Sequence, residues 1–342
     1  MKTKLFVGFL VGGILVFFSV RGIDFQDVAK SLQAIRGTYL APALLLMVLM
    51  QWLRAVRWGV LLSPLEKVGQ LSLFSVSNVG FLAIMAIPAR LGELARPYLI
   101  TQRSRIAMSS ALGTIVVERV MDTLTILAMT AFLLLSASLP LWMSKASGWM
   151  LLATLTATIL IVLMILRRET LEQKAGILMK RLPERYAAGA LRILHHFIDG
   201  FKVMKDAKSV VQASALSLII WLVDVLIIYL MFLSFDYPLP VSAAFVLMIV
   251  LIFGIAIPAA PGFVGNWHYF CVLGLTLYGI PKAEALSFAI VYHVLSVAVV
   301  LVMGLVCLPF QRFTLTDLRR QMSNKHSSVM AENPPPTQSR NS

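Results

Sequence analysis

Six charged residues lie in two short clusters within segments that are otherwise apolar. In each cluster a spacing of three or four residues puts charged side chains on one face of a helix, where opposite charges can pair. A charge in the middle of a bilayer costs on the order of 2.5–3.5 kcal/mol on insertion scales, so these residues need partners or a polar cavity. The first cluster is Arg90, Glu93 and Arg96, and the second is Glu118, Arg119 and Asp122.

The two clusters permit two interpretations. Their opposite formal charges are equal in number, so they can form a buried ion-pair network that holds helices together. Alternatively, they line a polar cavity that receives a charged head group, in which the planar guanidinium groups of arginine hold a phosphate and the acids keep the arginines in place. Thr114 and Thr125 extend the second cluster along the same stripe, so that helix should have one polar face.

Asp224 is a further acid near the middle of an apolar segment, preceded at helical spacing by Ser214, Ser217 and Trp221. An acid at membrane depth suggests a functional site, here for a cationic group or a coupling proton. The alternative is an ion pair with an arginine of the first cluster.

No catalytic, metal-binding or cofactor-binding motif is present. The sequence has no Walker A motif, no G-x-S-x-G, no H-E-x-x-H and no aspartate-rich metal motif, so we expect no catalytic residue, metal or cofactor. His268 and His293 are too few for a metal site and are interpreted as hydrogen-bonded core histidines, although His268 also counts as a candidate cavity residue. Cys271 and Cys307 lie in apolar segments and predict no disulfide.

Proline and glycine interrupt two apolar segments. Irregular backbone at membrane depth must be enclosed by protein or line a wet cavity, so we expect broken or re-entrant helices at both places. The tetrapeptide Ala-Ile-Pro-Ala begins each break, at 86–89 and at 256–259, and paired breaks of this kind point to a transporter site. The break residues are Pro88 and Gly92 in the first segment, and Pro261, Gly262 and Gly265 in the second.

The composition indicates that lipid surrounds most of these elements. Of 342 residues, 59% are hydrophobic and 13% are charged, whereas a soluble domain has about 25% charged residues. We therefore predict an all-α fold, a polytopic transmembrane helical bundle of about eight spans with additional broken helices. An amphipathic helix is expected over 22–37, and Trp52, Arg54, Arg57 and Trp58 are interpreted as an interfacial anchor at the end of one span. The expected spans are 5–20 (uncleaved), 38–62, 108–138, 149–166, 209–234, 239–257, 263–279 and 283–309, with the first broken pair within 71–101.

The formal net charge of +14 is explained by positively charged cytoplasmic segments, and no nucleic-acid motif accompanies it. Residues 167–208 carry ten Lys and Arg against five Asp and Glu, which predicts a cytoplasmic helical hairpin that meets anionic lipid head groups. We expect one membrane domain over 1–321, a disordered cytoplasmic tail over 322–342, both termini in the cytoplasm, and a location in the inner (plasma) membrane of the cell.

The order and spacing of these motifs resemble the lysylphosphatidylglycerol synthase transmembrane domain family of flippase-like membrane proteins, over roughly residues 5–310. The resemblance implies a bundle of helices, and lipid translocation in some relatives. Full-length synthases carry a soluble aminoacyl-transferase domain after the membrane part; here a short polar tail follows, so we expect no lysyl transfer. Many relatives have a glutamate in place of His268. The motifs are Pro88-Ala-Arg90-Leu-Gly92-Glu93-Leu-Ala-Arg96, Glu118-Arg119-Val-Met-Asp122, Pro261-Gly262-Phe-Val-Gly265 and the edge of Arg54, Arg57 and Trp58.

These observations favour a lipid flippase-like protein whose partner is a membrane lipid with a phosphate-bearing head group. Two other functions stay open on the sequence alone. One is a non-catalytic accessory of glycolipid or isoprenoid synthesis in the membrane, and the other is a small-solute transporter with a closed pocket.

Overall fold

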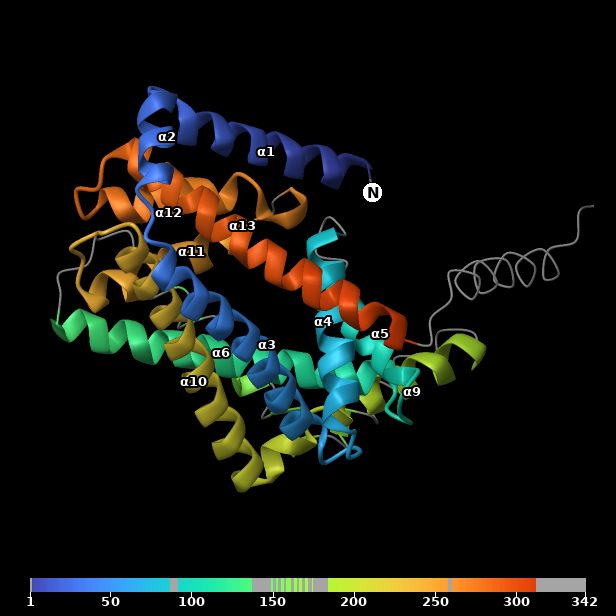
Figure 1. Cartoon of the computed structure of the whole chain (residues 1–342). Helices are drawn as coiled ribbons and strands as arrows, with labels where there is room; N and C mark the ends of the chain where they lie inside the picture. The colour runs from blue at the N-terminus through green and yellow to red at the C-terminus, as the bar shows by residue number, and fades with distance from the viewer. Residues whose placement is uncertain are drawn as a thin grey trace, which may run out of the picture.

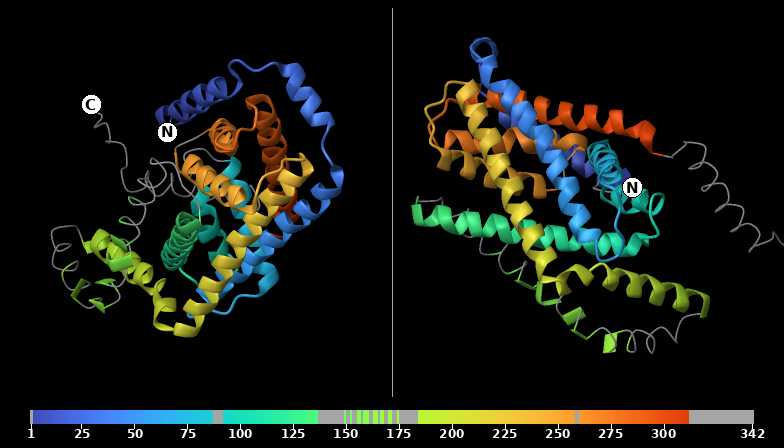
Figure 2. Two further views of the ribbon diagram at one scale, coloured as in Figure 1. Left: turned by 90° about the vertical axis from the view of Figure 1, so that its left-hand side faces the viewer. Right: turned by 60° about the horizontal axis from the view of Figure 1, so that its bottom comes forward.

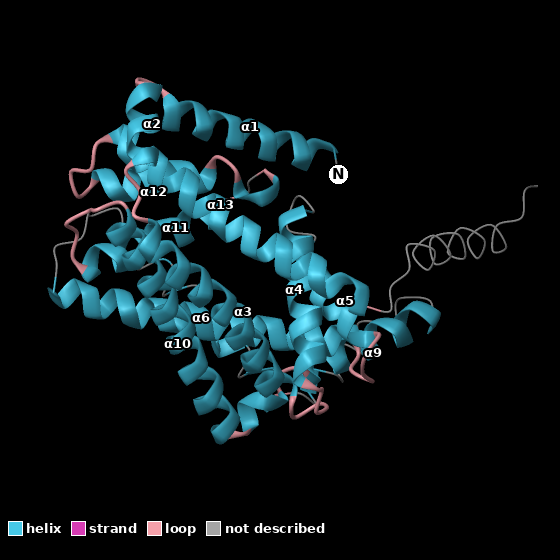
Figure 3. Cartoon of the chain, viewed as in Figure 1, coloured by secondary structure: helices cyan, strands magenta, loops and turns pink. Residues whose placement is uncertain are grey.

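The computed structural model describes residues 2–86, 92–136, 184–257 and 260–311, and short stretches between 149 and 174. Helices joined by loops make up this described part, and no strand occurs in it (Figure 3). The predicted all-α class is therefore confirmed. Pro88 and Arg90 lie outside the described residues, as do the loop at 139–148, most of 149–183 and the tail at 322–342.

Eleven labelled helices form the bundle among the described residues (Figure 1). Short 3-10 turns also occur at Gly37–Tyr39, Lys202–Lys205, Pro261–Phe263 and Leu308–Phe310. The helices are α1 (Lys2–Val20), α2 (Phe25–Gln33), α3 (Leu40–Leu62), α4 (Gln70–Ala86), α5 (Ala95–Thr101), α6 (Met108–Ser136), α9 (Glu184–Asp199), α10 (Ala207–Ser234), α11 (Val241–Ala256), α12 (Asn266–Thr276) and α13 (Lys282–Cys307).

The outer surface of the bundle is apolar, as a lipid environment requires. Among the described residues, three helical segments are long and apolar enough to cross a membrane: Gly37–Leu62, Ala207–Ser234 and Lys282–Phe310. Large apolar side chains on them are exposed, including Leu45 at 71% and Val306 at 59%. A soluble monomer rarely exposes so much apolar surface, so these faces contact lipid. Shorter apolar helices occur at Leu10–Val20, Gln70–Ala86 and Val241–Ala256.

Helices α3 and α10 lie side by side and run antiparallel (Figure 2). Near one end, the backbone amide of Arg36 donates to the carbonyl of Ser234 at 2.8 Å. Towards the other end, Arg57 donates to the hydroxyl of Ser217 at 2.8 Å. This pairing turns the inward face of α3 towards the polar stripe that the sequence predicts on α10.

Two apolar clusters pack on α3, and its polar residues lie between them. Ala43, Met47 and Met50 belong to a cluster formed mainly with α10, α11, α12 and α13. Trp58 and Leu61 belong to a second cluster with α4, α5, α6 and the segment after α9. The inward-facing polar residues of α3 come between these two groups, so both clusters fix the depth and orientation of the polar face.

The second predicted break ends a helix at the expected place. Helix α11 ends at Ala256, the first residue of its Ala-Ile-Pro-Ala sequence, and Ile257 is extended. Helix α4 is described as far as Ala86, and residues 87–91 of the first break lie outside the described residues. After the first break the chain returns against α4, and a Cβ added to Gly92 would lie 2.3 Å from the carbonyl oxygen of Ala83. After the second break Asn266 donates to the carbonyl of Gly254 at 2.9 Å, which satisfies an orphan carbonyl at the end of α11.

The predicted amphipathic helix is shorter than the sequence suggests, and the predicted hairpin is described only in part. Helix α2 spans nine residues of the expected 22–37, because Asp24 caps its first turn by accepting from the amide of Gln26 at 2.8 Å. Helix α9, within the expected hairpin at 167–208, packs closely on α6: a Cβ on Gly200 would lie 2.7 Å from the Cα of Gly113. The rest of the expected hairpin lies largely outside the described residues.

An N-cap fixes the start of α10 outside the apolar span. The carboxylate of Asp206 accepts from the backbone amides of Lys208 and Ser209, each at 3.2 Å, and from the Ser209 hydroxyl at 2.5 Å. The hydrogen bond from the Ser209 side chain lowers the pKa of Asp206 from its ordinary value. The carboxylate is thus held charged at the positive end of the helix dipole, which favours helix initiation there.

We expect Gly265→Ala to destabilise the protein by about 2–5 kcal/mol, measured as unfolding in detergent micelles. Gly265 has a φ of +91°, and an added Cβ would lie 2.3 Å from the carbonyl oxygen of Gly12 on α1. The substitution therefore strains the backbone and separates α1 from α12.

Gly279→Ala is the matched control for backbone strain. Gly279 has a φ of +77°, but nothing lies within 4 Å of an added Cβ. Gly279→Ala should cost only the strain of a left-handed backbone conformation, about 1–2 kcal/mol. Equal destabilisation by the two variants would contradict a steric role for the contact between Gly12 and Gly265.

Candidate functional site

Arg57 lies at the centre of a buried polar network, although the sequence suggested an interfacial anchor. Its side chain is 2% exposed and forms ion pairs with Asp122 and, at 3.2 Å, with Glu118. Its Nη1 also donates to the Ser217 hydroxyl at 2.8 Å. Trp58 beside it is fully buried and donates to Thr114 at 3.2 Å. The anchor interpretation was therefore wrong for both residues, because packing against α6 and α10 turns them inward.

Arg96 is held by α6 and by two aromatic rings. Its Nη1 and Nη2 each donate to one carboxylate oxygen of Glu118, both at 3.1 Å. This bidentate geometry is the strongest form of an arginine–carboxylate pair. The guanidinium carbon lies 4.3 Å from the ring centroid of Trp58 and 5.2 Å from that of Phe81, within range of a cation–π interaction. The terminal nitrogens of Arg96 are thus already occupied within the protein.

Arg54 and Arg119 are less fully paired. The side chain of Arg119 is 59% exposed, and its ion pairs with Glu118 at 2.6 Å and Asp122 at 3.4 Å both use Nη2. Arg54 forms no ion pair within the part of the chain that the structure describes. Its guanidinium lies 5.5 Å from the ring centroid of Phe81. These two arginines therefore have donor capacity for a ligand.

A cavity of about 440 Å³, which we call the arginine chamber, opens beside this network. Four arginines and two acids line it, and Glu118 stands behind them as the shared partner of three of the arginines. The lining comes from α3, α4, α5, α6, α10, α11, α13 and the two breaks. Its charged residues are Arg54, Arg57, Arg96, Arg119, Glu93 and Asp122.

A second cavity of about 230 Å³, which we call the second chamber, adjoins the first. Asp224 lies in it and interacts electrostatically with Arg54. Trp221 lines both chambers, and its indole nitrogen donates to Asp122 at 3.1 Å. Six residues line both chambers and mark the boundary: Arg54, Met85, Trp221, Ile255, Phe263 and Val300.

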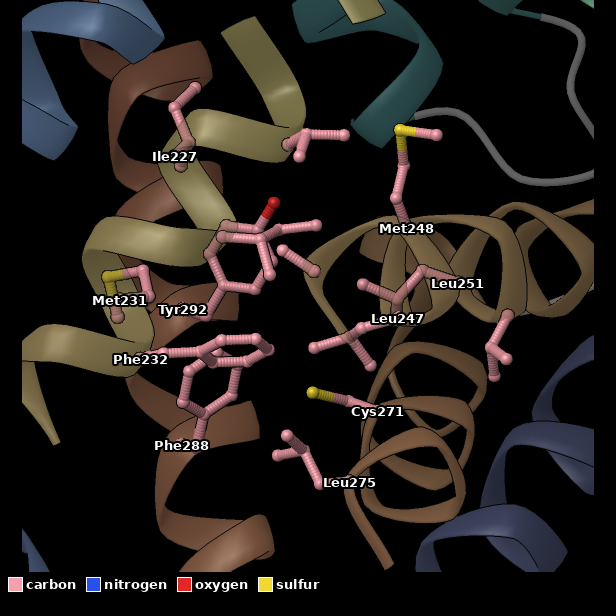
Figure 4. Packing of buried hydrophobic residues seen from close by; sticks show 14 of the residues in the cluster. Ile227, Met231, Phe232, Leu247, Met248, Leu251, Cys271, Leu275, Phe288 and Tyr292 are labelled. Atoms are coloured by element: carbon pink, nitrogen blue, oxygen red, sulfur yellow. The ribbon is translucent and has the colours of Figure 1, made fainter. Parts of the chain in front are cut away.

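Apolar residues close the far side of the second chamber. Figure 4 shows Phe288 and Tyr292 of α13 in one apolar layer with Phe232, and the Tyr292 hydroxyl extends away from Phe288. Of the labelled side chains, Ile227, Met248 and Leu251 also line the chamber. The chamber therefore has a polar side on α3, α10 and α12, and an apolar side on α11.

The positions of the charged residues along their helices suit a site inside the membrane. With a rise of 1.5 Å per residue, Arg57 lies about 7.5 Å from the end of α3 and Glu118 about 15 Å from the start of α6. The hydrocarbon core is about 30 Å thick. Water is scarce at such depth, so the charges depend on each other and on whatever enters the chambers.

The structure brings most of the predicted site residues together. Glu93, Arg96, Arg119 and Asp122 line the arginine chamber, and Asp224 lines the second. Asp224 interacts electrostatically with Arg54 of α3. The sequence predicted an arginine of the first cluster as its partner and placed Arg54 at the membrane interface. Among the described residues, Arg54 is therefore the neighbouring arginine. Arg90 and Pro88 lie outside the described residues.

The histidines and the second break occupy the edge of the second chamber. His293 lines it and forms a 2.8 Å hydrogen bond with the carbonyl of Gly262. His268 lines neither chamber; its ring lies 4.8 Å from that of His293, perpendicular to it. Gly262 and Gly265 have positive φ angles, and Pro261 begins the 3-10 turn. The backbone carbonyl of Gly262, within the second break, thus fixes the position of the His293 ring.

Sequence reasoning missed three residues that shape the site. Arg57 and Arg54 were assigned to an interface because they lie near the end of a span. Gln51, on the same face of α3, was not predicted as a site residue, although a glutamine inside an apolar span indicates a polar contact there. It is 2% exposed and lines the second chamber.

The chain was compared with known families and proteins. The model of the family described as the lysylphosphatidylglycerol synthase TM region matches residues 5–304. A UPF0104 membrane protein of Methanothermobacter thermautotrophicus is 23% identical over 330 residues, covering 91% of this chain and 96% of the relative. A UPF0104 membrane protein of Methanocaldococcus jannaschii is 23% identical over 318 residues, covering 90% and 94%. No solved structure matches the chain.

Proposed function

Because the chain belongs to the lysylphosphatidylglycerol synthase TM region family, we propose that this membrane protein binds a phosphate-bearing lipid and moves its head group through the arginine chamber. The acyl or prenyl chains would stay in the bilayer. The single observation that supports this most is a cavity inside an apolar bundle with four arginines in its wall.

The charge balance of the arginine chamber favours an anionic ligand. Its four guanidinium groups face three carboxylates, those of Glu93, Glu118 and Asp122. One guanidinium group is therefore left over, and a buried charge without a partner is costly. A phosphodiester, with one negative charge, would supply the missing partner.

The arginines would have different roles. Arg54 and Arg119 have unoccupied donors and would contact the phosphate. The terminal nitrogens of Arg57 and Arg96 are paired with Asp122, Glu118 and Ser217, so these two arginines would hold the acids in place. Glu93 would line the entrance.

The competing explanation is a purely structural ion-pair network. It accounts well for Arg57 and Arg96, which are buried and fully paired through their terminal nitrogens. It accounts less well for Arg54, because an arginine that only stabilises helices would be expected to meet a carboxylate directly. The absence of such a pair among the described residues favours a ligand.

The proposed placement in the cell follows from charge. The basic segment at 167–208 and both termini would face the cytoplasm, where anionic head groups attract lysine and arginine. The plasma membrane is then the expected location. No catalytic role is proposed for the chain.

We expect the purified protein in liposomes to accelerate transbilayer exchange of fluorescent phospholipid or polyprenyl-phosphate analogues, followed by dithionite quenching. Arg54→Gln should abolish the acceleration while leaving the protein folded, because Arg54 forms no direct ion pair among the described residues and glutamine keeps a hydrogen-bond donor near Asp224. Arg119→Gln should reduce it more than tenfold, the effect of losing about 1.4 kcal/mol of interaction with the phosphate.

Arg36→Gln is the matched control, because Arg36 pairs with Asp236 at 2.7 Å on an exposed surface. The Arg36→Gln protein should exchange lipid at the wild-type rate. Well-folded protein that accelerates none of the lipids would contradict the proposal and favour an accessory role. Transport of a water-soluble solute without lipid exchange would favour the small-solute transporter.

A further inference from the structure

The second chamber contains buried polar atoms that the protein does not satisfy. Gln51 Oε1 and Trp267 Nε1 are buried and have no hydrogen-bond partner among the described residues. Both residues line the chamber, as does Asp224, whose carboxylate accepts no hydrogen bond from any described residue. Leaving one such group unsatisfied costs about 1–3 kcal/mol. Two such atoms, with the Asp224 carboxylate in the wall of the same cavity, indicate a ligand that hydrogen-bonds to all three groups.

The chemistry of these atoms selects the kind of ligand. Gln51 Oε1 and the Asp224 carboxylate only accept hydrogen bonds, whereas Trp267 Nε1 only donates. An ammonium group could donate to the acceptors but could not accept from Trp267. Hydroxyl groups both donate and accept, so a group with several hydroxyls can satisfy all three.

The charge of the second chamber also favours an uncharged group. Asp224 is its one acid, and Arg54 at the boundary is the arginine assigned to the phosphate. Asp224 would therefore repel a second anion, while an ammonium would leave Trp267 without an acceptor. The volume of about 230 Å³ is below the roughly 300–1,000 Å³ of pockets for drug-sized ligands. It suits a head-group fragment such as glycerol or a single sugar ring.

We infer that the second chamber binds the uncharged polyol portion of the lipid head group whose phosphate occupies the arginine chamber. The inference rests on the proposed function, because Arg54 and Trp221 line both chambers and so place the polyol next to the phosphate. The ligand class is thus a phosphodiester lipid with a hydroxyl-bearing head group, from either a glycerol or a sugar-like source.

The test is displacement of a fluorescent phosphatidic acid analogue from the purified protein in detergent micelles. The competitors are phosphatidylglycerol, phosphatidylinositol, phosphatidylethanolamine and unlabelled phosphatidic acid. We expect the first two to bind about threefold to tenfold more tightly than phosphatidic acid, the effect of one added hydrogen bond of about 0.5–1.5 kcal/mol. Whichever of the two is preferred distinguishes a glycerol from a ring polyol.

Two substitutions each remove one of the unsatisfied polar groups. Gln51→Leu removes the acceptor together with the rest of the amide, and Trp267→Phe removes the donor while keeping a ring. Each should abolish the preference for polyol lipids and leave the affinity for phosphatidic acid within twofold. Leu45→Met, on the exposed face of the same helix as Gln51 and outside both chambers, should leave both unchanged.

The outcomes separate this inference from the proposed function. Equal affinities for all four lipids, unaltered by Gln51→Leu, would overturn the polyol site and leave phosphate binding intact; water would then fill the chamber. A preference for phosphatidylethanolamine that disappears in Asp224→Asn would overturn it in favour of a cation site. Binding of no lipid at all would overturn the proposed function, and this inference with it.

Discussion

Glu118→Gln is expected to destabilise the folded protein by about 3–5 kcal/mol, the cost of leaving buried charges without their partner. Glu118 is 2% exposed and pairs with three arginines, at 3.1 Å to Arg96, 3.2 Å to Arg57 and 2.6 Å to Arg119. Glutamine keeps the shape but removes the charge, so three guanidinium groups would share Asp122 and Glu93. The measurement is the free energy of unfolding in mixed micelles.

Asp27→Asn provides the control for loss of an ion pair as such. Asp27 pairs with Lys30 at 3.0 Å on α2, but both side chains are more than half exposed. Solvent screens such a pair, so its loss should leave the unfolding midpoint unchanged within error. If Glu118→Gln had as little effect as Asp27→Asn, the three arginines would have to be compensated otherwise, and Glu118 would not be the centre of the network.

Substitution of Glu118 should affect stability, and substitution of Arg54 should affect lipid exchange, for a physical reason. Glu118 is surrounded by protein cations, so its loss changes the energy of the fold. Arg54 has no such partner among the described residues, so its loss should change the energy of the bound lipid. A site that both stabilises the bundle and binds a ligand should show this division, whereas a purely structural network should show destabilisation at both positions.

Much of the fold could be predicted because the signals are local. The end of α11 follows from an Ala-Ile-Pro-Ala sequence, since proline cannot continue the helical hydrogen bonds. Glu118 and Asp122 were found because they lie four residues apart in an apolar span. The stripe of Ser217, Trp221 and Asp224 on α10 was found by the same spacing.

The rest depended on contacts between helices. Spacing tells which side chains share a face of one helix, but not which helix that face meets. Arg57 lies near the end of α3, a position typical of interfacial anchors, and only the antiparallel pairing with α10 shows that it reaches Ser217. The same pairing brings Gln51 to the second chamber. Close backbone approaches, such as Gly12 with Gly265, leave no pattern in a single sequence.

Gly80→Leu should destabilise the protein by at least about 3 kcal/mol, because it removes the space through which Arg96 reaches Glu118. An added Cβ on Gly80 would lie 2.2 Å from Cγ of Arg96. The stem of Arg96 runs across α4 at this glycine, and a leucine would displace it and separate its guanidinium from the carboxylate. The free energy of unfolding in mixed micelles measures the effect.

A double-mutant cycle tests whether the damage passes through Arg96. In the presence of Arg96→Ala, the arginine stem is absent and the leucine has room, so Gly80→Leu should cost about 0.5–3 kcal/mol less than in the wild type. Gly13→Leu on α1, where nothing lies within 4 Å of an added Cβ, should not destabilise the helix, because it replaces a glycine in an open position. Additive effects of Gly80→Leu and Arg96→Ala would mean that the leucine acts elsewhere on α4. The position of Arg96 fixes Glu118, and Glu118 in turn fixes Arg57 and Arg119. A large coupling would therefore establish that Gly80, which has no polar side chain, determines how the charged network is assembled.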